Sequence, residues 1–140
     1  MQNKFREFLK KNRYLPLSLW KSLKLEHGIK NKEVPVLIRQ AVGIKSGLYI
    51  YVKDNRILYV GKAKSLFGRI KGHYRESFEK VSGDTQFNTW HKFFSQKRNS
   101  GLIKIFWKEI DREDDRQILE KMLSRVLNPE FEKFRKQLEK

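Results

Sequence analysis

The sequence predicts an α/β protein of the α+β kind, in which a small, three-stranded, mainly antiparallel sheet is flanked by helices and follows a helical N-terminal extension. Two runs rich in β-branched and aromatic residues, 47–52 and 57–61, are separated by a short polar turn and predict a hairpin. A third such run follows at 102–107. Apolar residues spaced three and four positions apart before and between these runs are typical of amphipathic helices.

Residues 1–42 are predicted to form a basic helical N-terminal extension, packed on a domain that spans residues 43–140. Helices with interruptions are expected over residues 1–27. Their apolar stripe consists of Phe5, Phe8, Leu9, Leu15, Leu19 and Leu23. Residues 34–40 form a short apolar segment whose type the sequence leaves open.

The hairpin turn falls at residues 53–56, and its register depends on Tyr49 and Tyr59. A tight two-residue turn at Asp54-Asn55 would pair Ile50 with Tyr59 and send the two phenols to opposite faces. If the phenols share a face, odd-numbered residues must lie opposite odd-numbered ones, for example Tyr51 opposite Tyr59. A shared site therefore predicts a loop of about three or five residues, or a β-bulge.

A helix is expected to begin near Ser65, with Ser65 or a neighbouring residue as its N-cap. Further helices are expected over residues 89–98, 112–127 and 131–138, where apolar residues again recur at helical spacing. Gly68 and Gly72, inside the helix after Ser65, lower helix propensity and suggest the close approach of another backbone.

The chain is strongly basic, with 32 Lys and Arg against 16 Asp and Glu among 140 residues, a net charge of +16 and a pI near 10.1. All of the excess lies before Asp111, because residues 111–140 hold eight basic and eight acidic residues. An acidic polymer is the natural partner, since lysines and arginines near phosphates release condensed counterions. The alternative from charge alone is a ribosome-associated or merely very soluble basic protein.

Composition and motif content also exclude several classes of protein. The chain has no cysteine, so it has neither disulfides nor thiolate metal ligands, and a reducing, cytoplasmic setting is expected. No run approaches 18 consecutive apolar residues, so a membrane partner is not expected. Phosphate-binding glycine loops, HExxH zinc motifs and Ser/His/Asp motifs are absent from the sequence.

Five polar residues stand out on otherwise apolar elements. Tyr49 and Tyr59 lie on adjacent strands, and Arg69 and His73 lie one turn apart on the helix that follows. Glu120 flanks the apolar stripe of the last long helix. Two phenols, a guanidinium, an imidazole and a carboxylate are together able to cleave a phosphodiester with a divalent metal.

These residues resemble the GIY-YIG nuclease family. The resemblance covers about residues 43–132, and its motifs are specific as an ordered set, whereas either tripeptide alone is a weak signal. The matching positions are Gly47-Leu48-Tyr49, Tyr59-Val60-Gly61, Arg69, His73, Glu120 and Pro129. Two departures exist: Leu48 and Val60 replace Ile, and Glu132 stands where the family usually has Asn.

The resemblance implies a metal-dependent endonuclease that acts on DNA, expected to be double-stranded. Glu120 would bind one Mg²⁺ or Mn²⁺, and Tyr49 would activate water with the help of Tyr59 and His73. Arg69 would stabilise charge on the phosphate. Exposed cations near the second motif are the expected DNA contacts: Lys62, Lys64, Arg69 and Lys71.

Other interpretations stay open at this point. A catalytically weak or inactive GIY-YIG domain could serve as a nucleic-acid-binding module, and a basic RNA-binding protein would have a similar composition. Strand tyrosines usually pack against helices, and Glu120 could form an ordinary helix ion pair. Core or interface packing is the expected role of the three tryptophans, Trp20, Trp90 and Trp107.

Overall fold

The computed structural model describes residues 2–79 and 85–138 of the chain. Its helices are α1 (Gln2–Lys11), α2 (Val34–Val42), α3 (Leu66–Glu76), α4 (Thr85–Phe94), α5 (Glu113–Leu127) and α6 (Glu130–Leu138). Its strands are β1 (Lys21–His27), β2 (Gly47–Lys53), β3 (Arg56–Ala63) and β4 (Gly101–Glu109). No helix within the described residues is long and apolar enough to cross a membrane.

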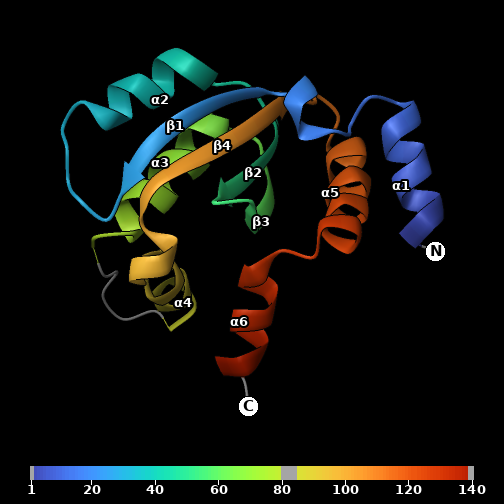
Figure 1. The fold of residues 1–140 in the computed structure, drawn as a ribbon. Coiled ribbons are helices and arrows are strands. Elements are labelled where there is room, and N and C mark those ends of the chain that lie inside the picture. Colours follow the sequence, from blue (N-terminus) through green and yellow to red (C-terminus); the bar gives the residue numbers. More distant parts are fainter. Residues whose placement is uncertain (1, 80–84, 139–140) are drawn as a thin grey trace.

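The strands form one antiparallel sheet in the order β1-β4-β2-β3, visible as arrows in Figure 1. The prediction of three strands is corrected to four, and the expected helix over residues 21–27 is wrong. Leu23, Leu25 and His27 alternate with polar residues and turn toward the core, which is strand periodicity. Leu19 and Leu23 also fit helical spacing, so this short segment was ambiguous from its sequence.

The apolar segment of undetermined type is helix α2. Val34, Ile38 and Val42 are its buried residues, and they recur every four positions on one face. The helix ends at Gly43, whose φ of 58° suits a residue without a side chain. The other helices and β4 form where they were predicted, with ends that differ from the predicted ones by at most four residues.

The β2–β3 hairpin combines a tight turn with a bulge. Asp54 and Asn55 have positive φ values of 50° and 65°, the conformation of a two-residue hairpin turn. The register then shifts, so that Val52 pairs with Ile57 but Tyr51 pairs with Tyr59. Leu58 is the extra residue. The predicted bulge is confirmed, and Tyr59 shares a sheet face with Tyr49.

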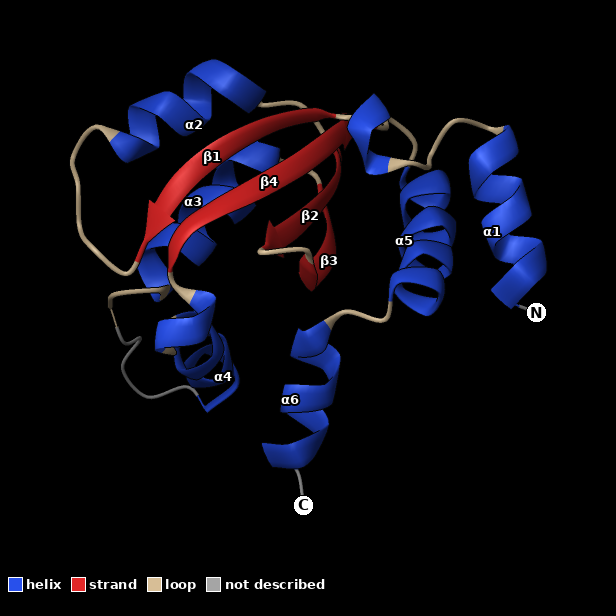
Figure 2. Ribbon diagram, viewed as in Figure 1, coloured by secondary structure: helices blue, strands red, loops and turns tan. Residues whose placement is uncertain are grey.

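Each face of the sheet carries its own core, and Figure 2 shows helices on both sides. On one face, Tyr49, Tyr51 and Ile105 pack with residues of α2, α3, α4 and α6. On the other, Leu48 and Ile50 pack with residues of α1 and α5. This three-layer arrangement places β3, an edge strand, between α3 on one face and α5 on the other.

The N-terminal part contributes to the second core. Leu9, Leu15 and Trp20 are buried there against residues of β2 and α5. α1 lies beside α5 (Figure 1), and the Arg6 guanidinium donates to the carbonyl oxygen of Val126 at 3.4 Å. The residues before position 43 therefore supply an edge strand and core side chains as well as positive charge.

Candidate active site

The glycines of the two motifs are required by close contacts across the sheet. A Cβ on Gly61 would collide with the rings of Tyr49 and Tyr59, because Gly61 lies directly opposite Tyr49. A Cβ on Gly47 would collide with the backbone carbonyl of Lys108 on β4. Glycine at 61 therefore makes the room in which the two phenols lie together.

Tyr49, Tyr59 and His73 meet on the sheet face that α3 covers. The centroids of the two phenol rings are 5.8 Å apart, and each lies within 5.6 Å of the imidazole centroid. The Tyr49 hydroxyl and His73 Nε2 are 2.8 Å apart, a hydrogen bond. Two strands and a helix thus bring together three of the five predicted catalytic residues.

Helix α3 positions His73 and Arg69. The predicted N-cap is confirmed, since the Ser65 Oγ accepts from the backbone N–H of Gly68 at 3.1 Å. Leu66, Ile70 and Tyr74 fix one face of the helix in the core. His73 lies on the buried side as well, and Arg69, one turn earlier, is exposed at the edge of the cluster.

Trp90 of α4 joins Arg69 to the cluster. Its indole stacks on His73 with centroids 4.2 Å apart, and the Arg69 guanidinium lies over the indole at 5.6 Å. Trp90 also contacts the edge of Tyr59, with centroids 4.8 Å apart. Trp90 was expected only to pack, but it shields the imidazole and holds the cation beside the phenols.

Burial sets the protonation states of this cluster. Complete burial raises the pKa of Tyr49 to about 12, although the nearby Arg69 charge opposes the shift. Burial also raises the pKa of Tyr59 and lowers that of His73. At neutral pH, therefore, both phenols hold their protons and the imidazole is neutral.

Glu120 approaches from the other side of β3. It is half-buried on α5 and lines a groove of about 860 Å³ between α1, α5 and α6. Burial raises its pKa and Lys62 lowers it, whereas Glu132, on the groove wall, raises it further. Tyr59 feels the same carboxylate, because Glu120 contributes to its raised pKa. Glu120 is thus within electrostatic reach of the Tyr59 phenol.

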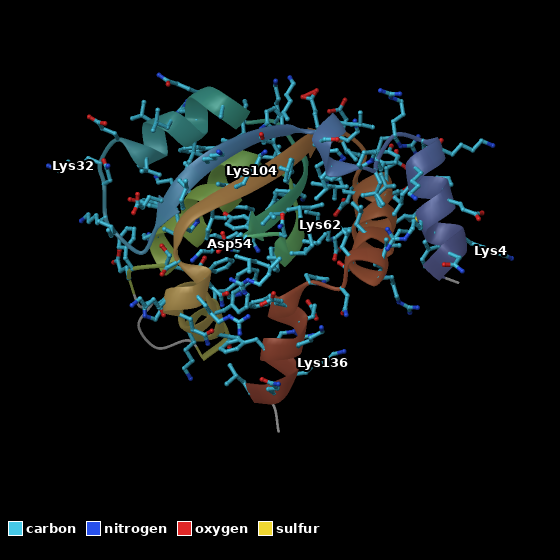
Figure 3. The ribbon with its side chains drawn as sticks, viewed as in Figure 1. Lys4, Lys32, Asp54, Lys62, Lys104 and Lys136 are labelled. Atoms are coloured by element: carbon cyan, nitrogen blue, oxygen red, sulfur yellow. The ribbon has the colours of Figure 1, made fainter. Side chains whose placement is uncertain are left out.

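The four predicted DNA contacts are all exposed but do not form one cluster. Lys62 is a residue of β3 and lies on the side of this strand that faces α5 in Figure 3. Lys64 immediately precedes Ser65, the N-cap of α3. Arg69 borders the phenols, whereas Lys71 lies over Phe67 at 5.4 Å on another side of the helix. The structure therefore brings Lys62 and Arg69 to the site and directs Lys71 away from Arg69.

The inference from Gly68 and Gly72 is wrong. A Cβ at Gly68 would meet the side chain of Ser65, and one at Gly72 would meet Glu76 Oε1 at 3.8 Å. No foreign backbone approaches either position within the described part of the chain. In this helix the glycines leave space that a larger residue could fill.

The donor set suits a hard divalent cation held mainly by water and phosphate. Among the described side chains, no three His, Cys, Asp or Glu residues come together as a metal site. Mg²⁺ commonly binds through one or two carboxylates and keeps several waters. The half-buried Glu120 meets that requirement, with the Glu132 carboxylate, paired to Arg135 at 2.9 Å, on the same groove.

Sequence reasoning missed Glu76 as a site residue. Its Oε1 lies 3.3 Å from Nδ1 of His73, and both side chains are almost completely buried. The spacing of three positions on one helix was a signal in the sequence. Its burial depends on how the helix packs in the fold, which the spacing does not reveal.

No family model matches this chain, and neither a curated protein nor a solved structure matches it. The likeness to GIY-YIG nucleases therefore depends on the motif residues themselves. Their geometry is the evidence on which a function can be argued.

Proposed function

We propose that this protein is a divalent-metal-dependent DNA endonuclease of the GIY-YIG type. The observation that carries the proposal is the hydrogen bond between the Tyr49 hydroxyl and His73 Nε2, 2.8 Å long, inside a cluster that Tyr59 and Arg69 complete. A tyrosine that only packed in the core would not need a buried imidazole acceptor, an arginine and a second phenol around its oxygen.

The Tyr49–His73 pair can move a proton away from an attacking water. As a water proton passes to the Tyr49 oxygen, the phenol proton passes to Nε2 of His73. Tyr49 returns to its protonated form and His73 becomes an imidazolium. This relay avoids a free phenolate, which burial disfavours because it raises the pKa of Tyr49 to about 12.

Arg69 and Glu120 would act on the phosphate from different elements. The guanidinium, exposed at the edge of the cluster, is placed to pair with phosphate oxygens and to offset charge that grows on them. Glu120 would hold the cation, Mg²⁺ or Mn²⁺, with Glu132 nearby. When bound, such a cation supplies positive charge at the scissile phosphate.

The electrostatics of the groove support a nucleic-acid partner. A carboxylate aimed at a phosphate repels it unless a cation lies between them, so Glu120 and DNA binding are compatible only with a metal or a lysine close by. Lys62 is that nearby cation in the protein itself. With a net charge of +16, the chain attracts polyanions over a long range.

A plasmid nicking assay with Mg²⁺ or Mn²⁺ tests the proposal. Glu120→Gln keeps the size of the side chain and removes its charge, so we expect nicking to fall at least about 10²-fold. Metal-free DNA binding should be equal or tighter, since one repulsive charge is gone. Glu113→Gln, an exposed position on the first turn of α5, is the matched control and should cut normally.

Two outcomes decide against parts of the proposal. If Glu120→Gln cuts at the wild-type rate, Glu120 is not the metal ligand and the site assignment fails. If the wild type binds DNA but cuts neither plasmid nor linear, branched or single-stranded substrates, the second candidate holds: a nucleic-acid-binding module. Glu132 favours that candidate, because its charge opposes ionisation of Glu120 where the family usually has a neutral Asn.

A further inference from the structure

Glu76 is a buried carboxylate at the end of α3, and it takes no part in the proton transfer between Tyr49 and His73 proposed above. It is 8% exposed, and acidic side chains are almost never that deeply buried without a partner. The side chain one turn earlier on the same helix is His73, 2% exposed. Glu76 Oε1 lies 3.3 Å from His73 Nδ1.

The two nitrogens of His73 therefore face different groups. Nε2 is hydrogen-bonded to the Tyr49 hydroxyl, and Nδ1 faces the carboxylate of Glu76. Within the described residues Nδ1 has no partner that meets hydrogen-bond geometry, so the 3.3 Å approach of Glu76 Oε1 is a polar contact and not a formed hydrogen bond. A neutral imidazole carries one N–H, and an unprotonated Nδ1 would place its lone pair against a carboxylate oxygen. The proton belongs on Nδ1.

Among the described groups packed around His73, Glu76 is the one whose charge would attract a proton on Nδ1. From β2 and β3 it faces the phenols of Tyr49, Tyr51 and Tyr59, and from α4 it faces the uncharged indole of Trp90. The charged or titratable groups that act on it electrostatically are Arg69 and Glu76 of α3, with His27 of β1 nearby. Arg69 repels an imidazolium, His27 is neutral near pH 7, and Glu76 attracts one.

We propose that Glu76 is a positioning residue that holds His73 as the Nδ1–H tautomer and stabilises the imidazolium formed when Tyr49 gives up its proton. In this step one proton passes from the Tyr49 oxygen to Nε2 and one passes from the attacking water to the Tyr49 oxygen. Two O–H bonds break, an N–H bond and a new phenol O–H bond form, and no electron is transferred. The second half rests on the proposed nuclease function. The tautomer assignment stands without it.

Long-range ¹H–¹⁵N correlation NMR of the full chain, labelled with ¹⁵N-histidine, tests the tautomer directly. In the wild type at neutral pH we expect His73 to show a protonated Nδ1 and an unprotonated Nε2. In Glu76→Leu the bias is removed, and the Nε2–H form that histidine prefers in water should appear. A wild-type spectrum with protonated Nε2 overturns the inference without any variant.

Kinetics separate positioning from a purely structural role. Glu76→Gln preserves volume but cannot neutralise an imidazolium, so kcat for nicking should fall about 10²-fold while KM for DNA stays within about twofold. Glu76→Asp, which restores the charge, should recover part of the loss. Glu79→Gln, an exposed position just past the end of α3, is the control and should leave both constants unchanged.

The failures are distinguishable. If the wild type shows the Nδ1–H tautomer but cuts no nucleic acid, the proposed function fails and the positioning by Glu76 stands. If the wild type cuts and Glu76→Gln cuts equally well, the catalytic role of Glu76 is overturned and the nuclease stands. If Glu76→Leu keeps the Nδ1–H tautomer, another group fixes the ring and the inference is wrong.

Discussion

Tyr51 lies opposite Tyr59 across the β2–β3 hairpin, two positions from the pair of Tyr49 with Gly61. The bulge at Leu58 makes this register possible after a two-residue turn. Side chains alternate between faces with a period of two, so without the bulge Tyr59 would point toward α5. One inserted residue thus decides whether the two phenols share a site.

Gly61→Ala should remove both stability and cleavage. The added methyl would overlap the rings of Tyr49 and Tyr59, and overpacking of this kind costs about 1–3 kcal/mol. Gly72→Ala is the contrasting variant, since its methyl has room and should stabilise the helix by about 0.5–1 kcal/mol. Urea unfolding of both proteins gives the comparison. A Gly61→Ala protein as stable as the wild type would contradict the close contact.

Lys62→Gln should weaken DNA binding in a salt-dependent way. If Lys62 contacts one phosphate, the slope of log K against log salt should become shallower by about 0.9. The pKa of Glu120 should also rise, because Lys62 lowers it in the wild type.

Lys32→Gln is the matched control for this substitution. Lys32 is exposed as well and lies at the opposite end of the view from α5 in Figure 3. Fluorescence anisotropy at several salt concentrations measures both slopes. Equal slopes for the two variants would remove Lys62 from the DNA interface.

His27 should make the protein less stable in mild acid. It is 1% exposed between Tyr51, Tyr74 and Phe94, and burial lowers its pKa from 6.5 to about 4. Between these pH values His27 is protonated in the unfolded chain but neutral in the folded chain. The stability that neutral His27 contributes is therefore complete above pH 6.5 and is lost as the pH falls toward 4.

The free energy of unfolding should fall by about 3 kcal/mol between pH 6.5 and 4. This figure is the free-energy difference that corresponds to the gap between the pKa values of His27 in the unfolded and folded chain. His27→Leu lacks the titrating group, so its free energy of unfolding should decline less over the same range. Chemical denaturation at a series of pH values measures the difference. Parallel curves for the two proteins would mean that His27 titrates normally in the fold.

The positive charge of α1 should add affinity without adding chemistry. Lys4, Lys10 and Lys11 are exposed on this helix, and Lys4 lies at the far end of α1 in Figure 3. Changing all three to Gln should make the salt slope shallower and leave kcat unchanged. An unchanged slope would indicate that α1 faces away from the nucleic acid.

Substitution is preferable here to deletion of residues 1–42. Leu9, Leu15 and Trp20 are buried in the second core, and each such side chain is worth about 1.5–3 kcal/mol. Removing them together with β1 would cost an amount comparable with the roughly 5–15 kcal/mol of stability typical of a domain. A truncated chain is therefore expected to be unfolded.

Most of the sheet, and the grouping of Tyr49, Tyr59 and His73 on one of its faces, could be predicted because local signals agreed with the fold. The runs of 47–52 and 102–107 are rich in β-formers, and the need to place Tyr49 beside Tyr59 predicted the bulge. β1 was missed because Leu19 and Leu23 satisfy helical spacing, while the pairing that makes this segment a strand comes from β4, far along the chain.

Glu76 and Trp90 could not be recognised for a related reason. The sequence places Glu76 three residues after His73, but many such pairs are solvated. Its importance comes from burial, to which β1 and α4 contribute around His73. Trp90 has no local signal at all, because its stacking on His73 depends on how α4 packs against α3.

The complete burial of Tyr49 has a kinetic consequence. Its side chain is 0% exposed, so no water or phosphate can touch the phenol oxygen in this conformation. Its partly exposed neighbours are Tyr59, Arg69 and Trp90. If the protein is the nuclease proposed above, turnover must include a step in which these side chains separate and readmit solvent, and the speed of that opening would set an upper limit on the rate of cleavage.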